Sequence, residues 1–170
     1  MPYETITADD GVVMNGYFEI VEGHRKPSIE FNFHIAIMNA VIHTQPLYSS
    51  VFGVIREVLT GIGENFVQIA GEKIINCEYA LPGPPEPAKN VVSGLGTERN
   101  AVMVPNHDTI CVGADFDTAM KIIHVVEKTA QVYIMARSID TPHLISDEDI
   151  KVRIGQVILQ YPSPSFPAGL

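Results

Sequence analysis

The stretch AVMVPNHDTICVGADFDTA, residues 101–119, carries the pattern that decides the fold. Its first four residues are continuously apolar and predict a buried strand, and residues 109–112 predict a second strand. Asn106-His107-Asp108 is expected to form the bend between the two strands. Asp115 or Asp117 then caps the longest predicted helix, about residues 116–138, whose apolar side chains recur at helical spacing. The stretch therefore predicts two adjacent strands followed directly by a helix.

The chain before residue 101 predicts further short elements. Residues 11–22 predict a hairpin, because Asn15-Gly16 separates two apolar runs and is a strong signal for a two-residue turn. Ser28 is expected to start a helix with Glu30 in its first turn. Strands are predicted at residues 40–43, 66–69 and 73–77. Helices are predicted at residues 46–59, ended by Gly61 and Gly63, and at 86–95 beyond a proline-rich loop at 81–87.

The chain after the long helix predicts one more helix and a tail. The helix begins near Ser146, and its first turn holds three carboxylates, which favour the helix dipole. Residues 162–170 are expected to form a loosely held tail, so that residues 1–161 make a single domain. Strands alternate with helices, which indicates the α/β class. The short strands and the early hairpin favour a mixed or antiparallel sheet between helices.

Composition narrows the range of functions. Hydrophobic residues make up 46% of the 170 residues and charged residues 18%, which is typical of a globular chain. The formal net charge of -9 disfavours nucleic acid, and an anionic substrate would need a local cationic pocket or a metal. No apolar run approaches the roughly 18 residues of a membrane span. Cys77 and Cys111 are expected to be buried free thiols, which fits a cytoplasmic location.

Three places hold residues that could carry chemistry. Glu30 and His34 would share one face of a helix, and His43 and Gln45 would share one face of a strand end. His107 lies in a loop after an apolar strand, where binding groups concentrate. Each place taken alone has an ordinary structural interpretation: a surface ion pair, a hydrogen-bonded histidine at a strand terminus, or a turn histidine.

The order of these places resembles the class II aldolase/adducin family. Pro27-Ser28-x-Glu30 precedes a helix that contains histidine, a strand then ends in His43-Thr44, and a later strand ends in Asn106-His107. Residues 22–28, 40–48 (AVIHTQPLY), 113–119 and 126–133 are similar to the segments that flank the family's site. The resemblance covers residues 10 to 154 and is closest to the L-fuculose-phosphate aldolase type.

The resemblance implies a fold, a metal and a set of roles. It implies a three-layer α/β/α fold with a central mixed, largely antiparallel sheet, and a zinc ion, or another divalent metal, held by three side chains. By position these are His43, Gln45 and His107, and Glu30 corresponds to the acid/base. In the family's sugar-phosphate aldolases the zinc stabilises the enediolate left by carbon–carbon cleavage of a small sugar phosphate. The resemblance also implies a cytoplasmic homotetramer in carbohydrate metabolism.

Four departures from the family pattern bear on activity. Gln45 stands where the family has histidine, and an amide oxygen is a poorer zinc ligand than imidazole. Asp108 stands where the family has glycine, either as a stray carboxylate near the metal or as a ligand. The connection at Met38 to Ala40 is shorter than the usual 2–6 residues, so the helix ends early or packs differently. The family's N-terminal phosphate-binding segment does not occur in this sequence, so the chain is expected to be an N-terminally shortened member.

Three functions therefore stand as alternatives. The first is a metal-dependent aldolase-type lyase with Glu30 as acid/base, because Glu30, His43 and His107 occur together. The second is a non-catalytic, adducin-like binding or structural module with a degraded site, which the loss of one ligand favours. The third is a related decarboxylase or dehydratase, which would differ in substrate contacts outside the metal ligands.

Overall fold

The computed structural model describes residues 5–37, 40–81 and 85–160, with the backbone alone for 156–160. Its centre is a three-stranded antiparallel sheet in the order β3-β7-β6, formed by β3 (Ala40–Thr44), β7 (Asp108–Gly113) and β6 (Ala101–Val104). Ile75, Asn76 and Cys77 run along the outer edge of β6, where Asn76 forms a parallel bridge to Met103. The sheet is therefore mixed and largely antiparallel, as the sequence predicts.

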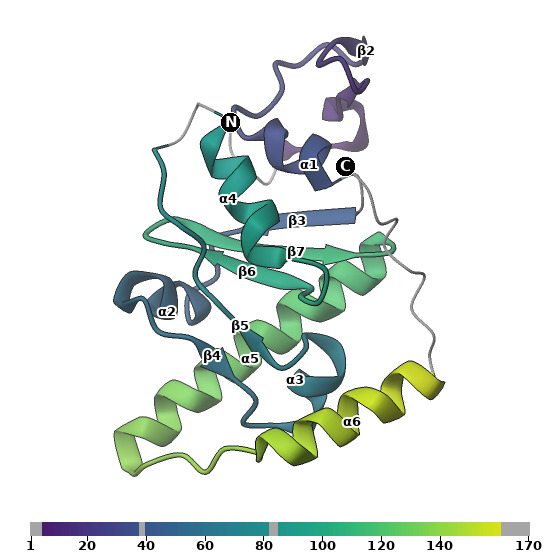
Figure 1. Cartoon of the computed structure of the whole chain (residues 1–170). Helices are drawn as coiled ribbons and strands as arrows, with labels where there is room; N and C mark the ends of the chain where they lie inside the picture. The colour runs from purple at the N-terminus through teal and green to yellow at the C-terminus, as the bar shows by residue number, and fades with distance from the viewer. Residues whose placement is uncertain (1–4, 38–39, 82–84, 161–170) are drawn as a thin grey trace.

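Helices cover both faces of this sheet (Figure 1). On one face lie α1 (Phe31–Ile37) and α4 (Glu86–Leu95), which pack on each other and on the sheet. On the other face lie α5 (Phe116–Ile139) and α2 (Ser49–Ile55), with α3 (Glu64–Ile69) and α6 (Asp147–Gln160) beyond them. This three-layer α/β/α arrangement confirms the fold class expected from the sequence.

Strand alternation divides the core into two clusters. Along β7, Ile110 and Val112 face α1 and α4 together with Phe33 and Val91, whereas Cys111 faces α5. Every residue of β6 and β7 is buried, which explains why β6 is a continuous apolar run. Cys77 and Cys111 are both buried and free, as expected.

Two predicted boundaries shift without changing the elements. The early hairpin pairs β1 (Val13–Met14) with β2 (Ile20–Glu22) after a 3-10 turn η2 (Ala8–Asp10). The prediction of a two-residue turn at Asn15-Gly16 is wrong, because the hairpin has a longer loop. The amide of Asn15 donates to the carbonyl of Glu19, and Phe18 adopts a positive φ of 67° within this loop. The predicted helix from Ser28 begins at Phe31, after a turn in which the Ser28 hydroxyl accepts from the amide of Glu30.

Two other predictions are wrong in kind. Residues 66–69, predicted as a strand, form helix α3, because Phe66, Val67 and Ala70 are buried together on one helical face. Within the predicted helix 46–59, the only helix is α2 (Ser49–Ile55). It ends because Arg56 adopts the left-handed conformation, and Leu59 already begins strand β4 (Leu59–Thr60). Strand β4 pairs with β5 (Lys73–Ile74), the first part of the predicted strand 73–77.

The remaining predictions agree with the structure or fall outside it. The helix at 86–95 and the capped long helix form as predicted, and the Asp115 side chain accepts from the amide of Thr118. Helix α6 begins beside Ser146, whose hydroxyl accepts from the amide of Asp149. The short connection at residues 38–39 and the tail at 162–170 lie outside the described residues. Within the described ranges, no helix combines the length and apolar character that a membrane crossing requires.

Helix α2 has no cap of its own, and Glu127 of α5 supplies one. The two carboxylate oxygens accept from the backbone amides of Tyr48 and Ser49, at 2.7 and 2.9 Å. We expect Glu127→Gln to lose at least one of these charge-assisted bonds and to lower the free energy of unfolding by about 1.5–3 kcal/mol. Denaturant unfolding measures the change. The neighbouring exposed Lys128→Gln is the control and should stay within about 0.5 kcal/mol of the parent. Equal effects of the two variants would contradict the capping role.

Candidate metal centre

The side chains of the candidate site meet on the sheet face that α1 covers. His43 of β3 pairs with Ile110 of β7 across the sheet, so both point toward α1 and α4. Asp108 has the same parity in β7 as Ile110 and therefore lies on the same face. Glu30 immediately precedes α1 on that face, and His107 ends the turn between β6 and β7, where Asn106 adopts a positive φ of 57°.

Four side chains gather there: Glu30, His43, His107 and Asp108. Each offers one ligand atom so that all four atoms lie within 4.8 Å of one another. The Glu30 carboxylate lies 3.2 Å from His107 Nε2 and 3.5 Å from His43 Nδ1. Asp108 Oδ2 contacts His43 Nε2 and lies 3.2 Å from His107 Nδ1. Two carboxylates thus bracket two imidazoles.

Burial controls the protonation of this cluster. It lowers the pKa of His43, with the Glu30 carboxylate opposing the shift and the neighbouring imidazoles of His107 and His34 adding to it. Burial also raises the pKa of Asp108 to about 8, and the negative charge of Glu30 adds to that rise. Both shifts favour uncharged forms, so near pH 7 the metal-free pair of His43 and Asp108 is a hydrogen bond between neutral groups.

The donor set fits a divalent metal ion. Imidazole nitrogens and carboxylate oxygens are ordinary zinc ligands, and bonds of about 2.0–2.2 Å place neighbouring ligand atoms roughly 3.3 Å apart. One ligand atom from each of the four residues lies within 4.8 Å of the others, which is close enough for the side chains to share one ion after small movements. Asp108 Oδ1 is buried and has no hydrogen-bond partner among the described residues, so one oxygen in the cluster is left for a ligand.

The structure differs from the sequence analysis at Gln45 and Asp108. Strand β3 ends at Thr44, and Gln45 is exposed beyond it, so the alternation that would place Gln45 beside His43 stops one residue too early. Asp108, expected in the bend, is the first residue of β7 and lies inside the cluster. Its parity with Ile110 and Val112 was the sequence signal that could have placed it there. His34 lies apart from the four-residue cluster and lines a neighbouring pocket.

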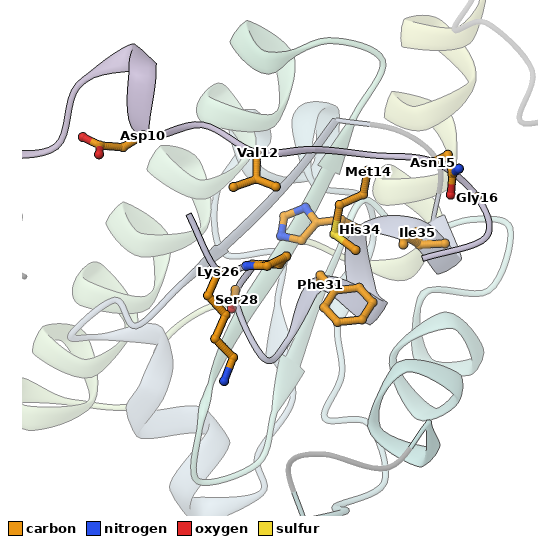
Figure 2. Close-up of a pocket in the computed structure, with 11 residues that line it drawn as sticks. Asp10, Val12, Met14, Asn15, Gly16, Lys26, Ser28, Phe31, His34 and Ile35 are labelled. Carbon is orange, nitrogen blue, oxygen red and sulfur yellow. The ribbon is translucent and has the colours of Figure 1, made fainter. Parts of the chain in front are cut away.

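That pocket, of about 750 Å³, opens between the early hairpin and α1 (Figure 2). Its lining includes Ser28 and Phe31, which flank Glu30 in the chain, and the ammonium-bearing Lys26. Asp10 also lines it, but Arg25 is paired to that carboxylate with Nε at 2.6 Å. Burial lowers the pKa of His34, which favours its neutral form. The pocket lining thus includes a cation and a hydroxyl, Lys26 and Ser28, in a chain that is acidic overall.

Comparisons with known proteins show the family of the chain. The sequence matches the family described as Class II Aldolase and Adducin N-terminal domain over residues 1–134. It is 27% identical over 155 residues to a 5-deoxy-D-ribulose 1-phosphate aldolase of Bacillus thuringiensis, covering 88% of this chain and 71% of that protein. It is 29% identical over 159 residues to an L-fuculose phosphate aldolase of Escherichia coli, covering 89% and 73%.

A solved structure matches as well. An L-fuculose 1-phosphate aldolase superposes with a TM-score of 0.85 at 27% identity, covering 92% of this chain and 76% of that one. The fold therefore agrees with the family match over residues 1–134, which spans more than half of the chain. The protein belongs to the class II aldolase and adducin family.

Proposed function

We propose that this protein is a metal-dependent aldolase that cleaves a small sugar phosphate of the fuculose-phosphate or ribulose-phosphate type. The observation that carries the proposal is the gathering of Glu30, His43, His107 and Asp108 within 4.8 Å, beside a pocket that holds Lys26. The relatives named as sugar-phosphate aldolases give the substrate class. Zinc is the metal that the two imidazoles favour.

The residues divide the work of an aldol cleavage among them. His43 and His107 hold the metal, which when bound supplies Lewis-acid polarisation of the substrate oxygens. Cleavage removes the proton from the hydroxyl group of the carbon that becomes the aldehyde. The electron pair of the broken carbon–carbon bond stays on the fragment next to the carbonyl, and that carbon then takes up a proton. Glu30 carries the proton, because its carboxylate is 19% exposed and lies within the cluster, 3.2 Å from His107 Nε2. Lys26 binds the phosphate, against the chain's net charge of -9.

The test combines metal analysis with a cleavage assay on the full chain. We expect near-stoichiometric zinc by elemental analysis and release of dihydroxyacetone phosphate from L-fuculose 1-phosphate or 5-deoxy-D-ribulose 1-phosphate. His107→Ala should lose both metal and cleavage while staying folded, whereas the exposed His124→Ala on α5 should keep both. Metal that is unchanged in His107→Ala would remove that residue from the ligand set.

A second function is favoured by the exposure of Gln45 at the position where the third ligand was expected. In that case the chain is a non-catalytic, adducin-like binding module. A purified protein that stays without metal after zinc is added, and cleaves neither sugar phosphate, would support this alternative. Metal binding without cleavage of either compound would point instead to a related decarboxylase or dehydratase. The homotetramer and the cytoplasmic location stay predictions, which sedimentation and fractionation would check.

A further inference from the structure

We propose that Asp108 is the third protein ligand of the metal, in the role that the sequence analysis gave to Gln45. The inference rests on the proposed metal site and specifies its ligand set as His43, His107 and Asp108. Glu30, the more exposed of the two carboxylates, is then left to move the proton.

The burial of Asp108 carries the first step. The residue is 2% exposed, and its side chain is fully covered. Oδ2 contacts both histidines of the cluster, and Oδ1 has no hydrogen-bond partner in the described part of the chain. A covered carboxylate oxygen without a partner costs free energy, which a cation between the carboxylate and the imidazoles would offset. The position therefore suits a ligand better than a purely structural residue.

The position of Gln45 carries the second step. Strand β3 ends one residue before it, and its side chain is exposed, whereas the four clustered residues are partly or fully buried. An amide oxygen is also a weaker partner for zinc than a carboxylate oxygen. Asp108 starts the strand that pairs with β3, so it reaches His43 from the neighbouring strand rather than from the end of the same one.

A ligand set with Asp108 in place of Gln45 changes which metal ions the site prefers. A carboxylate in place of a neutral side chain lowers the net charge of the metal and its ligands by one. Two imidazoles with a carboxylate bind zinc, but an added hard oxygen ligand also improves the site for Mn²⁺ relative to a site of nitrogen ligands alone. We therefore expect the protein to bind Mn²⁺ measurably beside Zn²⁺, and removal of Asp108 to weaken both.

The experiment titrates the metal-stripped full chain with Zn²⁺ and with Mn²⁺ against a chromophoric chelator. Asp108→Asn keeps the shape of the side chain and removes its charge, and Asp108→Ala removes the ligand altogether. Loss of a residue that only hydrogen-bonds to a metal ligand already lowers metal affinity by about 10–100-fold, so we expect a loss on the order of 100-fold or more in both variants. Gln45→Ala and the exposed Asp117→Asn are the controls, and both should stay within about twofold of the parent.

The outcomes separate this inference from the proposed function. A parent chain that binds zinc while Asp108→Asn and Asp108→Ala bind it equally well would overturn the ligand assignment and leave the metal-dependent function standing. The same holds if Gln45→Ala, and not the Asp108 variants, loses the metal. A parent chain that binds no metal would overturn both. Metal-free melting of Asp108→Asn is the folding check, and its Tm should stay close to that of the parent because asparagine keeps the shape of the buried side chain and adds no buried charge.

Discussion

Replacing Glu30 with glutamine is expected to lower the kcat of sugar-phosphate cleavage by about 10²–10⁴-fold while the metal stays bound. A positioned general acid or base contributes a factor of this size, and glutamine keeps the shape of the side chain without its ability to exchange a proton. The Glu30 carboxylate lies 3.2 Å from His107 Nε2 and is partly exposed, whereas the side chain of Asp108 is fully covered. Steady-state kinetics and elemental analysis of the same preparation measure the two quantities.

The metal content decides how this result is interpreted. If Glu30→Gln loses activity and metal together, Glu30 is a ligand and the proton is carried by another group. If it keeps its activity, the proposed role is wrong. Glu148→Gln, at an exposed position in the first turn of α6, is the matched control and should change neither quantity. A rise in KM with an unchanged kcat would assign Glu30 to substrate binding instead.

The sequence predicts the central sheet and its covering helices because their signals are local. Residues 101–104 and 109–112 are short apolar runs on either side of a turn, and Asp115 is a standard helix cap. The structure follows these signals closely. Helix α4 likewise begins at the predicted residue, Glu86, with Pro87 in its first turn.

The mistakes occur where long-range contacts decide. Arg56 ends α2 in the left-handed backbone conformation, which residues other than glycine rarely adopt. Its guanidinium donates to the carbonyl of Gly53 and to the side chain of Asn106, which lies in the turn between β6 and β7. Nothing in residues 46–59 alone signals that contact.

Residues 66–69 are an apolar run too short for periodicity to separate a strand from a helix. Ala70, buried with Phe66 and Val67, carried the helical signal.

The site was predictable in its histidines and not in its carboxylate. The order of Glu30, His43 and His107 in the chain was enough to expect them together, and the structure brings them within one cluster, although their roles stay predictions. The expected pairing of His43 with Gln45 assumed that β3 continues beyond Thr44, which it does not. Placing Asp108 required the register of β7 against β3 and β6, and register is set by partner strands and not by the bend itself.

The second large effect is expected at Gly113, where β7 passes into α5. A Cβ atom at this position would overlap the backbone nitrogen of Ala119 and lie 2.9 Å from the carbonyl oxygen of Asp115. These are backbone atoms, so no rotation of a side chain relieves the overlap. We expect Gly113→Ala to cost about 3 kcal/mol, at the upper end of overpacking effects, out of a total of roughly 5–15 kcal/mol. Thermal unfolding would show this as a fall in Tm of about 6–12 °C.

Gly155→Ala is the matched control with the opposite sign. Gly155 lies on the exposed side of α6 with nothing within 4 Å of an added Cβ, so the same substitution should stabilise the protein by about 0.5–1 kcal/mol. The rise in Tm on adding zinc distinguishes a defect at the junction of β7 and α5 from a defect at the metal site. Gly113 and Asp108 stand at opposite ends of β7, so saturating zinc should raise the Tm of Gly113→Ala by as much as that of the parent. If zinc does not raise the Tm of Gly113→Ala, the packing of α5 on the sheet also determines the position of Asp108. The site would then depend on the whole length of β7.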